Sequence, residues 1–320
     1  MLDYSHEYVE GKKIQQRKVF GMKKVDNYGY LFILPFFIIF IIFSIYPIIL
    51  TFYYSFTNYS GMGAPDIIGL SNYARLLTDS YFVQAFYNTI YIWGINFFFQ
   101  IVIALLLALL FSDIRLKLKG LGFFRAVFYL PNLITIASVA LLFGILLGWH
   151  HGTINHLLLQ LGLISEPINW LNNPTTARWS VALIGAWMWF GHTFIILMAG
   201  ISGISKDYFE SALIDGANRL QTFTKITLPL LKPILLYVLI TSLIGGLQIF
   251  DLPMLITDGL GSPEGSLNTM VLYLYNQAFR YNNFGYAAAV AYGLFLITVL
   301  FSYITFKSMY RNTTNKGAGR

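Results

Sequence analysis

Six long apolar stretches, none of which contains Asp, Glu, Lys or Arg, alternate with polar segments along the chain. They cover residues 31–50, 82–111, 126–148, 179–203, 234–250 and 284–306. A helix of about 20 residues spans the hydrocarbon core of a membrane, and backbone polar groups at that depth must be bonded within the protein. The pattern therefore predicts an all-α polytopic membrane protein, with six transmembrane helices in residues 28–308 and tails at 1–27 and 309–320.

The composition supports a membrane protein and removes several other classes. Hydrophobic residues make up 57% of the 320 residues and charged residues only 11%, which is unlike a soluble domain. There is no cysteine, so disulfides, thiolate metal sites and cysteine nucleophiles are impossible. The net charge of +7 comes from basic residues near the ends of the apolar stretches, so we expect a lipid bilayer, and no nucleic acid, as their partner.

The basic residues also predict the orientation of the chain. If residues 1–27 are cytoplasmic, 18 of the 21 Lys and Arg residues fall in segments on the cytoplasmic side, in agreement with the positive-inside rule. Arg75, Arg178 and Arg280 are left on the other side. The expected topology places both termini in the cytoplasm, together with segment 204–232.

Segment 204–232, between the fourth and fifth apolar stretches, is the most distinctive polar part of the chain. Asp207 and Glu210 have the spacing of a helix N-cap and its N3 partner, and Gly216 can end such a helix. A second short amphipathic segment precedes Pro229 and Pro233, which suit the first turn of the next long helix. We expect two short helices joined at Gly216.

One motif in this segment has a fixed spacing, and its residues are Glu210, Ser211, Ala212, Asp215, Gly216, Ala217, Ile226, Thr227, Leu228 and Pro229. It resembles the E-A-A…G…I-x-L-P cytoplasmic loop of permease subunits of bacterial binding-protein-dependent ABC importers. Its D-G-A form is similar to that of the carbohydrate-uptake branch, of the maltose and glycerol-phosphate type. Serine replaces the first alanine of the family motif and is small enough for the same position. The alternative interpretation of the segment is an ordinary cytoplasmic loop helix.

The resemblance, which covers residues 28–307, implies a function and a set of partners. In the family this loop is a coupling helix that docks on an ATPase subunit. The resemblance implies a second, similar permease, two ATPase subunits that bind ATP and Mg, and an extracytoplasmic solute-binding protein. The chain itself would bind no cofactor and would lie in the bacterial cytoplasmic membrane. The implied mechanism is alternating access, with a carbohydrate, expected to be an oligosaccharide, as the solute.

Four residues are candidates for the solute path. Asp251 ends a charge-free stretch and follows Gln248 and Phe250; ionisable groups near membrane depth usually face a cavity or a partner. Trp187 belongs to a group of aromatic residues on which the apolar face of a sugar can stack. The alternatives are an interfacial cap or a contact with the second permease for Asp251, and the interfacial aromatic belt for the tryptophan.

The sequence lacks the motifs that other classes of function require. The sequence has no G-x-x-x-x-G-K-[ST], no G-x-S-x-G and no H-E-x-x-H, so we expect no catalytic residue in this chain. His150, His151 and His156 suggest a metal, but no carboxylate or cysteine has ligand spacing, so no metal site is expected. A secondary transporter would need charges within the spans. A permease for another small polar solute remains the alternative within the class.

Overall fold

The computed structural model describes residues 26–112 and 120–314. The expected N-terminal tail lies almost wholly outside these residues, as do Arg115, Lys117, Lys119 and the end of the C-terminal tail. The described part contains no β-strand, only one isolated bridge between Thr57 and Ile67. An all-α polytopic fold is therefore confirmed.

The helices follow one another along the chain with short connections. Three of them include a π-helical turn, at Ile41–Ile45, Phe223–Thr227 and Asn276–Arg280. The α-helices are α1 (Asp26–Phe40), α2 (Tyr46–Tyr54), α3 (Ser71–Thr78), α4 (Ser80–Ser112), α5 (Leu121–Leu133), α6 (Ile136–Leu146), α7 (Thr153–Gln160), α8 (Pro174–Ser202), α9 (Lys206–Ile214), α10 (Arg219–Thr222), α11 (Leu228–Leu247), α12 (Asp251–Ile256), α13 (Met270–Tyr275) and α14 (Phe284–Thr314).

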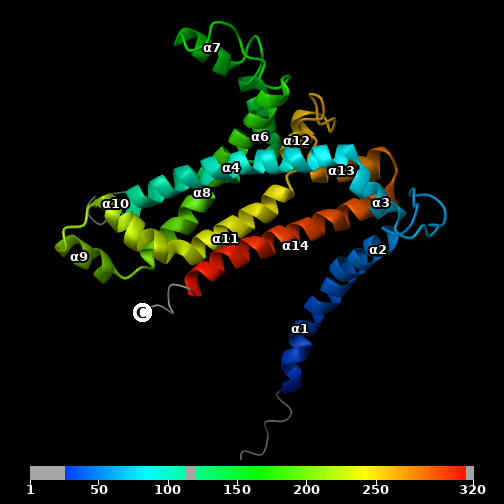
Figure 1. Cartoon of the computed structure of the whole chain (residues 1–320), viewed down its shortest axis with the longest axis horizontal. Coiled ribbons are helices and arrows are strands. Elements are labelled where there is room, and N and C mark those ends of the chain that lie inside the picture. The colour runs from blue at the N-terminus through cyan, green and yellow to red at the C-terminus, as the bar shows by residue number, and fades with distance from the viewer. Residues whose placement is uncertain (1–25, 113–119, 315–320) are drawn as a thin grey trace, which may run out of the picture. The chain divides into compact units, whose positions relative to one another are not determined.

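The chain divides into two compact units, residues 1–51 and 52–320. The described part of the first unit is helical and apolar, and no residue in the apolar window of its span is buried. In the second unit α4, α8, α11 and α14 run side by side (Figure 1). The α9–α10 loop lies at one end of these helices, and α3, α12 and α13 lie at the other.

The expected number of spans agrees with the structure. Within residues 26–112 and 120–314, five helices are long and apolar enough to cross a membrane, and the number is six if the bent pair α5–α6 counts as one span. The expectation for the third span is corrected, because residues 126–148 do not form one straight helix. Instead α5 and α6 meet at 88°. Pro131 lies in the last turn of α5, and Thr135 caps α6 by accepting from the Ser138 N–H, so the sequence stops one helix and starts another.

The fifth span is longer than expected, since it runs through residues 219–256 with a break near Phe250. The second short amphipathic helix is therefore not separate but leads into the span through the π-turn Phe223–Thr227. Pro229 explains the turn: it cannot donate to the Lys225 carbonyl, and its ring clashes with that group in a regular helix. Pro47 has the same relation to the π-turn at Ile41–Ile45.

The α4–α8 pair forms the centre of the second unit. The side chain of Gln100 donates to the Thr193 hydroxyl at 2.6 Å between the two buried residues. A Cβ atom at Gly185 would lie 2.0 Å from the Asn96 side-chain nitrogen, so glycine allows this close approach. Apolar residues above and below these polar contacts fill the interface.

At the end of the second unit opposite the α9–α10 loop, one carboxylate is hydrogen-bonded to three helices. Asp79 accepts hydrogen bonds from the hydroxyls of Tyr273 on α13 and Tyr286 on α14, and from backbone N–H groups that start α4. The Arg75 guanidinium lies 3.9 Å from the centre of the Tyr286 ring. Burial raises the pKa of Asp79, but these hydrogen bonds outweigh burial and hold the pKa below its usual value.

Asp79→Asn should destabilise the protein at neutral pH, by on the order of 1–3 kcal/mol, because it removes hydrogen bonds to a charged group. Since the folded-state pKa is lowered, the contribution is present at pH 7 and is lost as the pH falls through the acidic range where the carboxylate takes up its proton. Thermal unfolding of the purified protein measures the change. Asp66→Asn, at an exposed loop position, is the control; equal midpoints for the two variants would contradict the role of Asp79.

Candidate functional site

The α9–α10 loop is built from two well-defined helix ends. Ser205, and not Asp207, is the N-cap of α9, because its hydroxyl accepts the Asp207 N–H. At the other end the Ala217 N–H donates to the Ala212 carbonyl and the Gly216 N–H to the Leu213 carbonyl. This is a Schellman motif, and Gly216 has the positive φ of +73° that it requires. The predicted glycine end of the helix is confirmed.

The next helix begins two residues later with its own cap. The Asn218 side chain accepts the Gln221 N–H at 2.8 Å, and the Gln221 side chain accepts the Asn218 N–H at 2.9 Å. This reciprocal capping box satisfies two donors at the helix start. The chain direction is thus fixed on both sides of Gly216, and the loop is a defined turn between two helices.

Most of the motif faces outward. In its first part, Glu210, Ser211, Asp215 and Gly216 are exposed, Ala217 is half-buried and Ala212 is buried; Thr227, in the second part, is also buried. Ile214 is 85% exposed, which is unusual for a large aliphatic side chain on a short helix and leaves it free to contact another molecule. Beside the motif, a largely apolar cavity of about 470 Å³ lies between α9, α10 and the ends of α4 and α8.

A second, smaller cavity lies among the spans themselves. It has a volume of about 180 Å³ and is enclosed by α4, α8 and α11. The indole N–H of Trp93 donates to the Ser242 hydroxyl at 3.3 Å, and the Gln100–Thr193 hydrogen bond lies in the same wall. Its polar and aromatic lining is Trp93, Asn96, Gln100, Trp189, His192, Thr193, Thr241 and Ser242.

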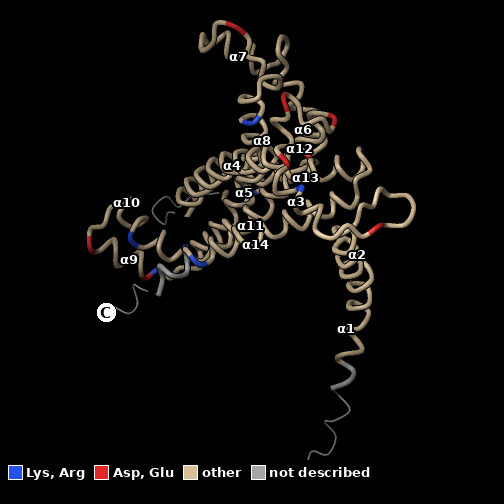
Figure 2. The backbone as a smooth tube through the Cα atoms, turned by 45° about the vertical axis from the view of Figure 1, so that its right-hand side comes forward, with Lys and Arg blue, Asp and Glu red and all other residues tan. Residues whose placement is uncertain are grey.

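The charged residues avoid this region. Figure 2 shows them toward the ends of the helices, with uncharged chain between. His192 is the titratable group in the cavity wall, and its ring centre lies 5.8 Å from that of Trp189 and 6.2 Å from that of Tyr129. The cavity can therefore offer hydrogen bonds and aromatic faces to a neutral, polar molecule.

The four candidate path residues lie in different places. Trp187 packs against Phe143, with ring centres 5.4 Å apart, in the core cluster around α8. Gln248 and Asp251 are exposed at the break between α11 and α12. Phe250 is half-buried against Tyr275. None of the four belongs to the lining of the smaller cavity, which the neighbouring Ile249 does reach.

Sequence reasoning missed the cavity residues, although a signal was present. Trp93, Asn96 and Gln100 follow one another at intervals of three and four in an otherwise apolar stretch, which places them on one helical face. His192–Thr193 and Thr241–Ser242 are similar polar pairs within later stretches. The spacing identifies a polar stripe on each helix, but it does not say that the three stripes meet.

Segment 149–178, which contains the three candidate histidines, is organised around the buried side chain of Asn155. Asn155 donates to the carbonyls of Trp149 and Ile168 and accepts from the indole N–H of Trp170. His150 stacks on Trp149, with ring centres 4.1 Å apart. No group of three or more His, Cys, Asp or Glu side chains that could hold a metal occurs in residues 26–112 and 120–314.

These features describe a helical, multi-pass membrane protein with a polar cavity among its spans and a capped loop at one end. Residues 100–307 match the family model described as the binding-protein-dependent transport system inner membrane component. The chain belongs to this family, and it is a permease subunit of a binding-protein-dependent ABC transporter. The resemblance noted in the α9–α10 loop is confirmed.

Relatives match over nearly their whole length. The chain is 35% identical to the lactose transport system permease protein LacF of Rhizobium radiobacter, over 88% of this chain and 93% of that protein. It is 34% identical to the arabinooligosaccharides transport system permease protein AraP of Bacillus subtilis, over 91% and 90%. It is 29% identical to the trehalose/maltose transport system permease protein MalF of Thermococcus litoralis, over 87% and 92%.

A solved structure has the same fold. It is the crystal structure of a bacterial alginate ABC transporter in complex with alginate pentasaccharide-bound periplasmic protein. The match has a TM-score of 0.78 and 26% sequence identity, and covers 91% of this chain and 96% of that one. The similarity therefore includes both the spans and the loop regions described above.

Gly191→Ala should disturb the α5–α8 packing beside the cavity. A Cβ atom at Gly191 would lie 1.8 Å from the Phe128 carbonyl oxygen, so backbone must move, at a cost of about 1–3 kcal/mol. Gly144→Ala is the matched control, because a Cβ there meets nothing within 4 Å. Thermal unfolding should show a lower midpoint for Gly191→Ala alone; an unchanged midpoint would disprove the close packing.

Proposed function

We propose that the chain forms half of a translocation path for a carbohydrate that an extracytoplasmic binding protein delivers. The observation that carries this proposal is the cavity among α4, α8 and α11. Its lining combines amides and hydroxyls with two indoles. Hydrogen bonds can fix the hydroxyls of a sugar, and an indole offers a flat surface to the apolar face of its ring. The names of LacF, AraP and MalF support a saccharide.

The remaining partners follow from the same proposal. The chain pairs with a second, similar permease, and two separate ATPase subunits bind ATP and Mg. This chain contributes no catalytic residue and holds no cofactor. The solved alginate transporter in complex with a periplasmic protein supports a binding-protein partner. With the α9–α10 loop and both termini in the bacterial cytoplasm, the opposite end of the spans faces that binding protein.

The α9–α10 loop is proposed to couple ATP hydrolysis to the spans. A coupling element must transmit displacement without folding up. The Schellman motif at Gly216 and the capping box at Asn218 give the loop such a defined shape. Glu210, Ser211 and Asp215, together with Ile214, form the exposed surface that would contact the ATPase, while Ala212 packs inward and Ala217 follows the turn.

Solute would pass first near the break between α11 and α12 and then through the cavity. Gln248 and Asp251 remain candidates for polar contacts near that break, where both side chains are exposed. Phe250 would form part of the same region. Trp187 would act less directly, since it packs against Phe143. Trp189 and the hydroxyls of α11 supply the sugar contacts in the cavity.

ATP-dependent uptake tests the substrate class. The transporter, purified from its native host with the subunits that accompany this chain, is reconstituted in vesicles with its binding protein. Labelled lactose, maltose, trehalose and arabinotriose are then offered. At least one sugar should enter with ATP and not without it. Uptake driven by a proton or sodium gradient without ATP, or uptake of none of these sugars, would disprove the proposal.

Thr241→Val should reduce uptake of that sugar about three- to tenfold, the effect of one lost hydrogen bond. The matched control is Thr298→Val on α14, because both hydroxyls donate to the carbonyl four residues earlier, at 2.8 Å, and only Thr241 lines the cavity. Initial uptake rates over a range of sugar concentrations measure the effect. Equal losses in both variants would mean that the cavity hydroxyl does not contact the sugar.

Gly216→Val should leave the chain in the membrane but separate ATP hydrolysis from uptake. Valine strongly disfavours a positive φ, at a cost of about 1–2 kcal/mol, so the Schellman motif should be lost. Gly216→Asn is the control, because asparagine tolerates this conformation. The number of ATP molecules hydrolysed per sugar taken up should rise for the valine variant only. Normal coupling in that variant would refute the role of the loop.

A further inference from the structure

A guanidinium group is held in a fixed position at the end of α8 that lies away from the α9–α10 loop. Arg178 donates through Nε to the side-chain oxygen of Asn88 on α4 at 2.9 Å. Asn88 is fully buried, and its amide nitrogen donates to the carbonyls of Gly265 and Asn268. The two terminal nitrogens of Arg178 have no hydrogen-bond partner among the described residues, so they remain available to an acceptor.

Two tyrosine rings lie beside this guanidinium, and a tryptophan is hydrogen-bonded to one of them. Its central carbon lies 5.7 Å from the ring centre of Tyr87 and 5.9 Å from that of Tyr91, within cation–π range. The indole N–H of Trp179 donates to the Tyr91 hydroxyl at 3.1 Å. Tyr87 and Trp179 are exposed. A cation is thus set among ordered, amphipathic rings of the kind that occupy the membrane–water interface.

An exposed aliphatic and aromatic strip continues from these rings toward the middle of the spans. Phe98 and Val102 follow on α4 with exposed fractions of 59% and 37%, and Leu183 follows Trp179 on α8 with 42%. Tyr91 and Val102 are 11 residues apart, which is about 16 Å along a helix. That distance is about half of a hydrocarbon core roughly 30 Å thick, so the strip has the depth of one leaflet.

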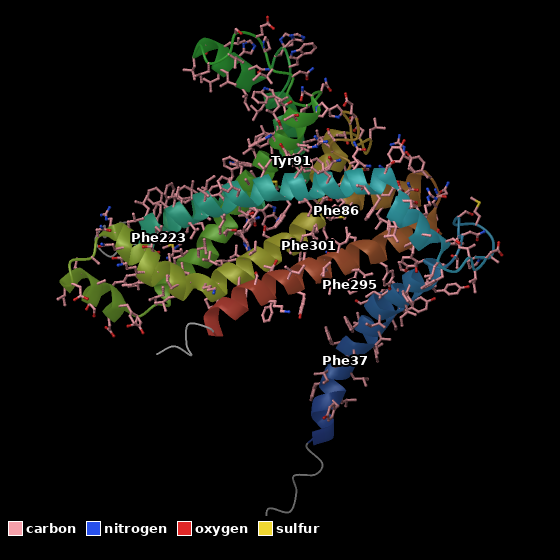
Figure 3. All side chains as sticks on the ribbon, in the orientation of Figure 1. Phe37, Phe86, Tyr91, Phe223, Phe295 and Phe301 are labelled. Carbon is pink, nitrogen blue, oxygen red and sulfur yellow. The ribbon has the colours of Figure 1, made fainter. Side chains whose placement is uncertain are left out.

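The strip is separate from the proposed sugar path. Tyr91 and Phe98 are each two residues away from cavity residues on α4, a rotation of about 200°. Figure 3 shows Tyr91 on the side of α4 away from Phe86 and Phe301, which lie between α4 and α14. A sugar in the cavity would therefore not contact these rings.

We propose that Arg178, Tyr87, Tyr91 and Trp179 bind the phosphodiester headgroup of a phospholipid in the leaflet opposite the α9–α10 loop. The assignment rests on the order in which charged, amphipathic and apolar side chains follow one another along the membrane normal. A cation with free donors comes first, then amphipathic rings, then an apolar strip one leaflet long. A phospholipid has the same order of phosphate, glycerol region and acyl chains. Guanidinium groups also match phosphate oxygens with two parallel hydrogen bonds.

The proposed site has a structural consequence. Asn88 joins the guanidinium to residues 265 and 268 of the loop that follows α12. Lipid bound at Arg178 would hold this guanidinium against Asn88 and so support the anchor of that loop. The inference depends on the chain being a multi-pass membrane protein and does not depend on the identity of the transported solute.

The test measures lipid bound to the complete transporter. The transporter is purified from vesicles of dioleoylphosphatidylcholine with dioleoylphosphatidylglycerol, and native mass spectrometry counts the phosphatidylglycerol retained on this chain. Arg178→Gln should weaken retention about tenfold, the effect expected for a lost charge-assisted hydrogen bond, and Tyr87→Leu should weaken it less. Arg280→Gln is the matched control, because Arg280 is another arginine at this end of the spans and its side chain is exposed.

Each outcome decides the proposal. Loss of retention in Arg178→Gln with normal retention in Arg280→Gln supports it. Equal retention in wild type and Arg178→Gln would overturn it, as would displacement of the lipid by millimolar inorganic phosphate, which would indicate an anion site. If the isolated chain retains the lipid but the complete transporter does not, a second subunit covers this face and the proposal is wrong. Uptake of the sugar by Arg178→Gln distinguishes this failure from a failure of the transport proposal.

Discussion

The close contact between α4 and α8 is the interaction on which the second unit depends. Within a hydrocarbon core, burying apolar side chains gives little preference for protein over lipid, so helices associate through tight packing and hydrogen bonds. The pair uses both. Gly185 admits the Asn96 side chain, and Gln100 bonds to Thr193 at 2.6 Å. The same two helices then supply two of the three walls of the cavity, and α11 completes it. A polar chamber can exist at this depth because its polar groups also hold the helices together.

Much of the fold follows from the sequence because its signals are strong and local. Six charge-free stretches define the spans, the basic residues favour one topology, and the positive φ of Gly216 follows from a glycine placed after a short helix. The helix breaks are harder. Two of the three π-turns, at Ile41–Ile45 and Phe223–Thr227, end shortly before a proline and so have a local cause, but the same prolines would also suit the start of a new helix. Pro131 and the Thr135 cap are visible in the sequence as signals for a helix break. The 88° angle between α5 and α6 depends on the three-dimensional packing of the two helices.

The site was less predictable than the fold because it depends on contacts between distant segments. Asp251 stands out in the sequence as an acid at the end of an apolar stretch, and Trp187 as one of a group of aromatic residues. The structure brings together other residues, such as Asn96, Trp189 and Ser242, which come from three helices. Each is unremarkable in its own stretch. Their importance depends on how the helices are rotated about their axes, and that rotation is set by packing at small residues such as Gly185 and Gly246, whose Cβ atoms would meet Asn96 and Trp93.

Two helices, α8 and α11, connect the cavity to the α9–α10 loop along the chain, and α4 lies beside both the loop and the cavity. α8 carries His192 and Thr193 and ends at the Ser205 cap of α9. α11 carries Thr241 and Ser242 and begins after the π-turn that follows α10. The Schellman motif and the capping box make the loop between them a defined element. A force on the exposed face of α9 can therefore reach the cavity along α8 and α11, and also through α4, whose end lies beside the loop. Because α4 is bonded to α8 through Gln100–Thr193 and to α11 through Trp93–Ser242, a displacement of either helix changes the positions of the polar groups that line the cavity.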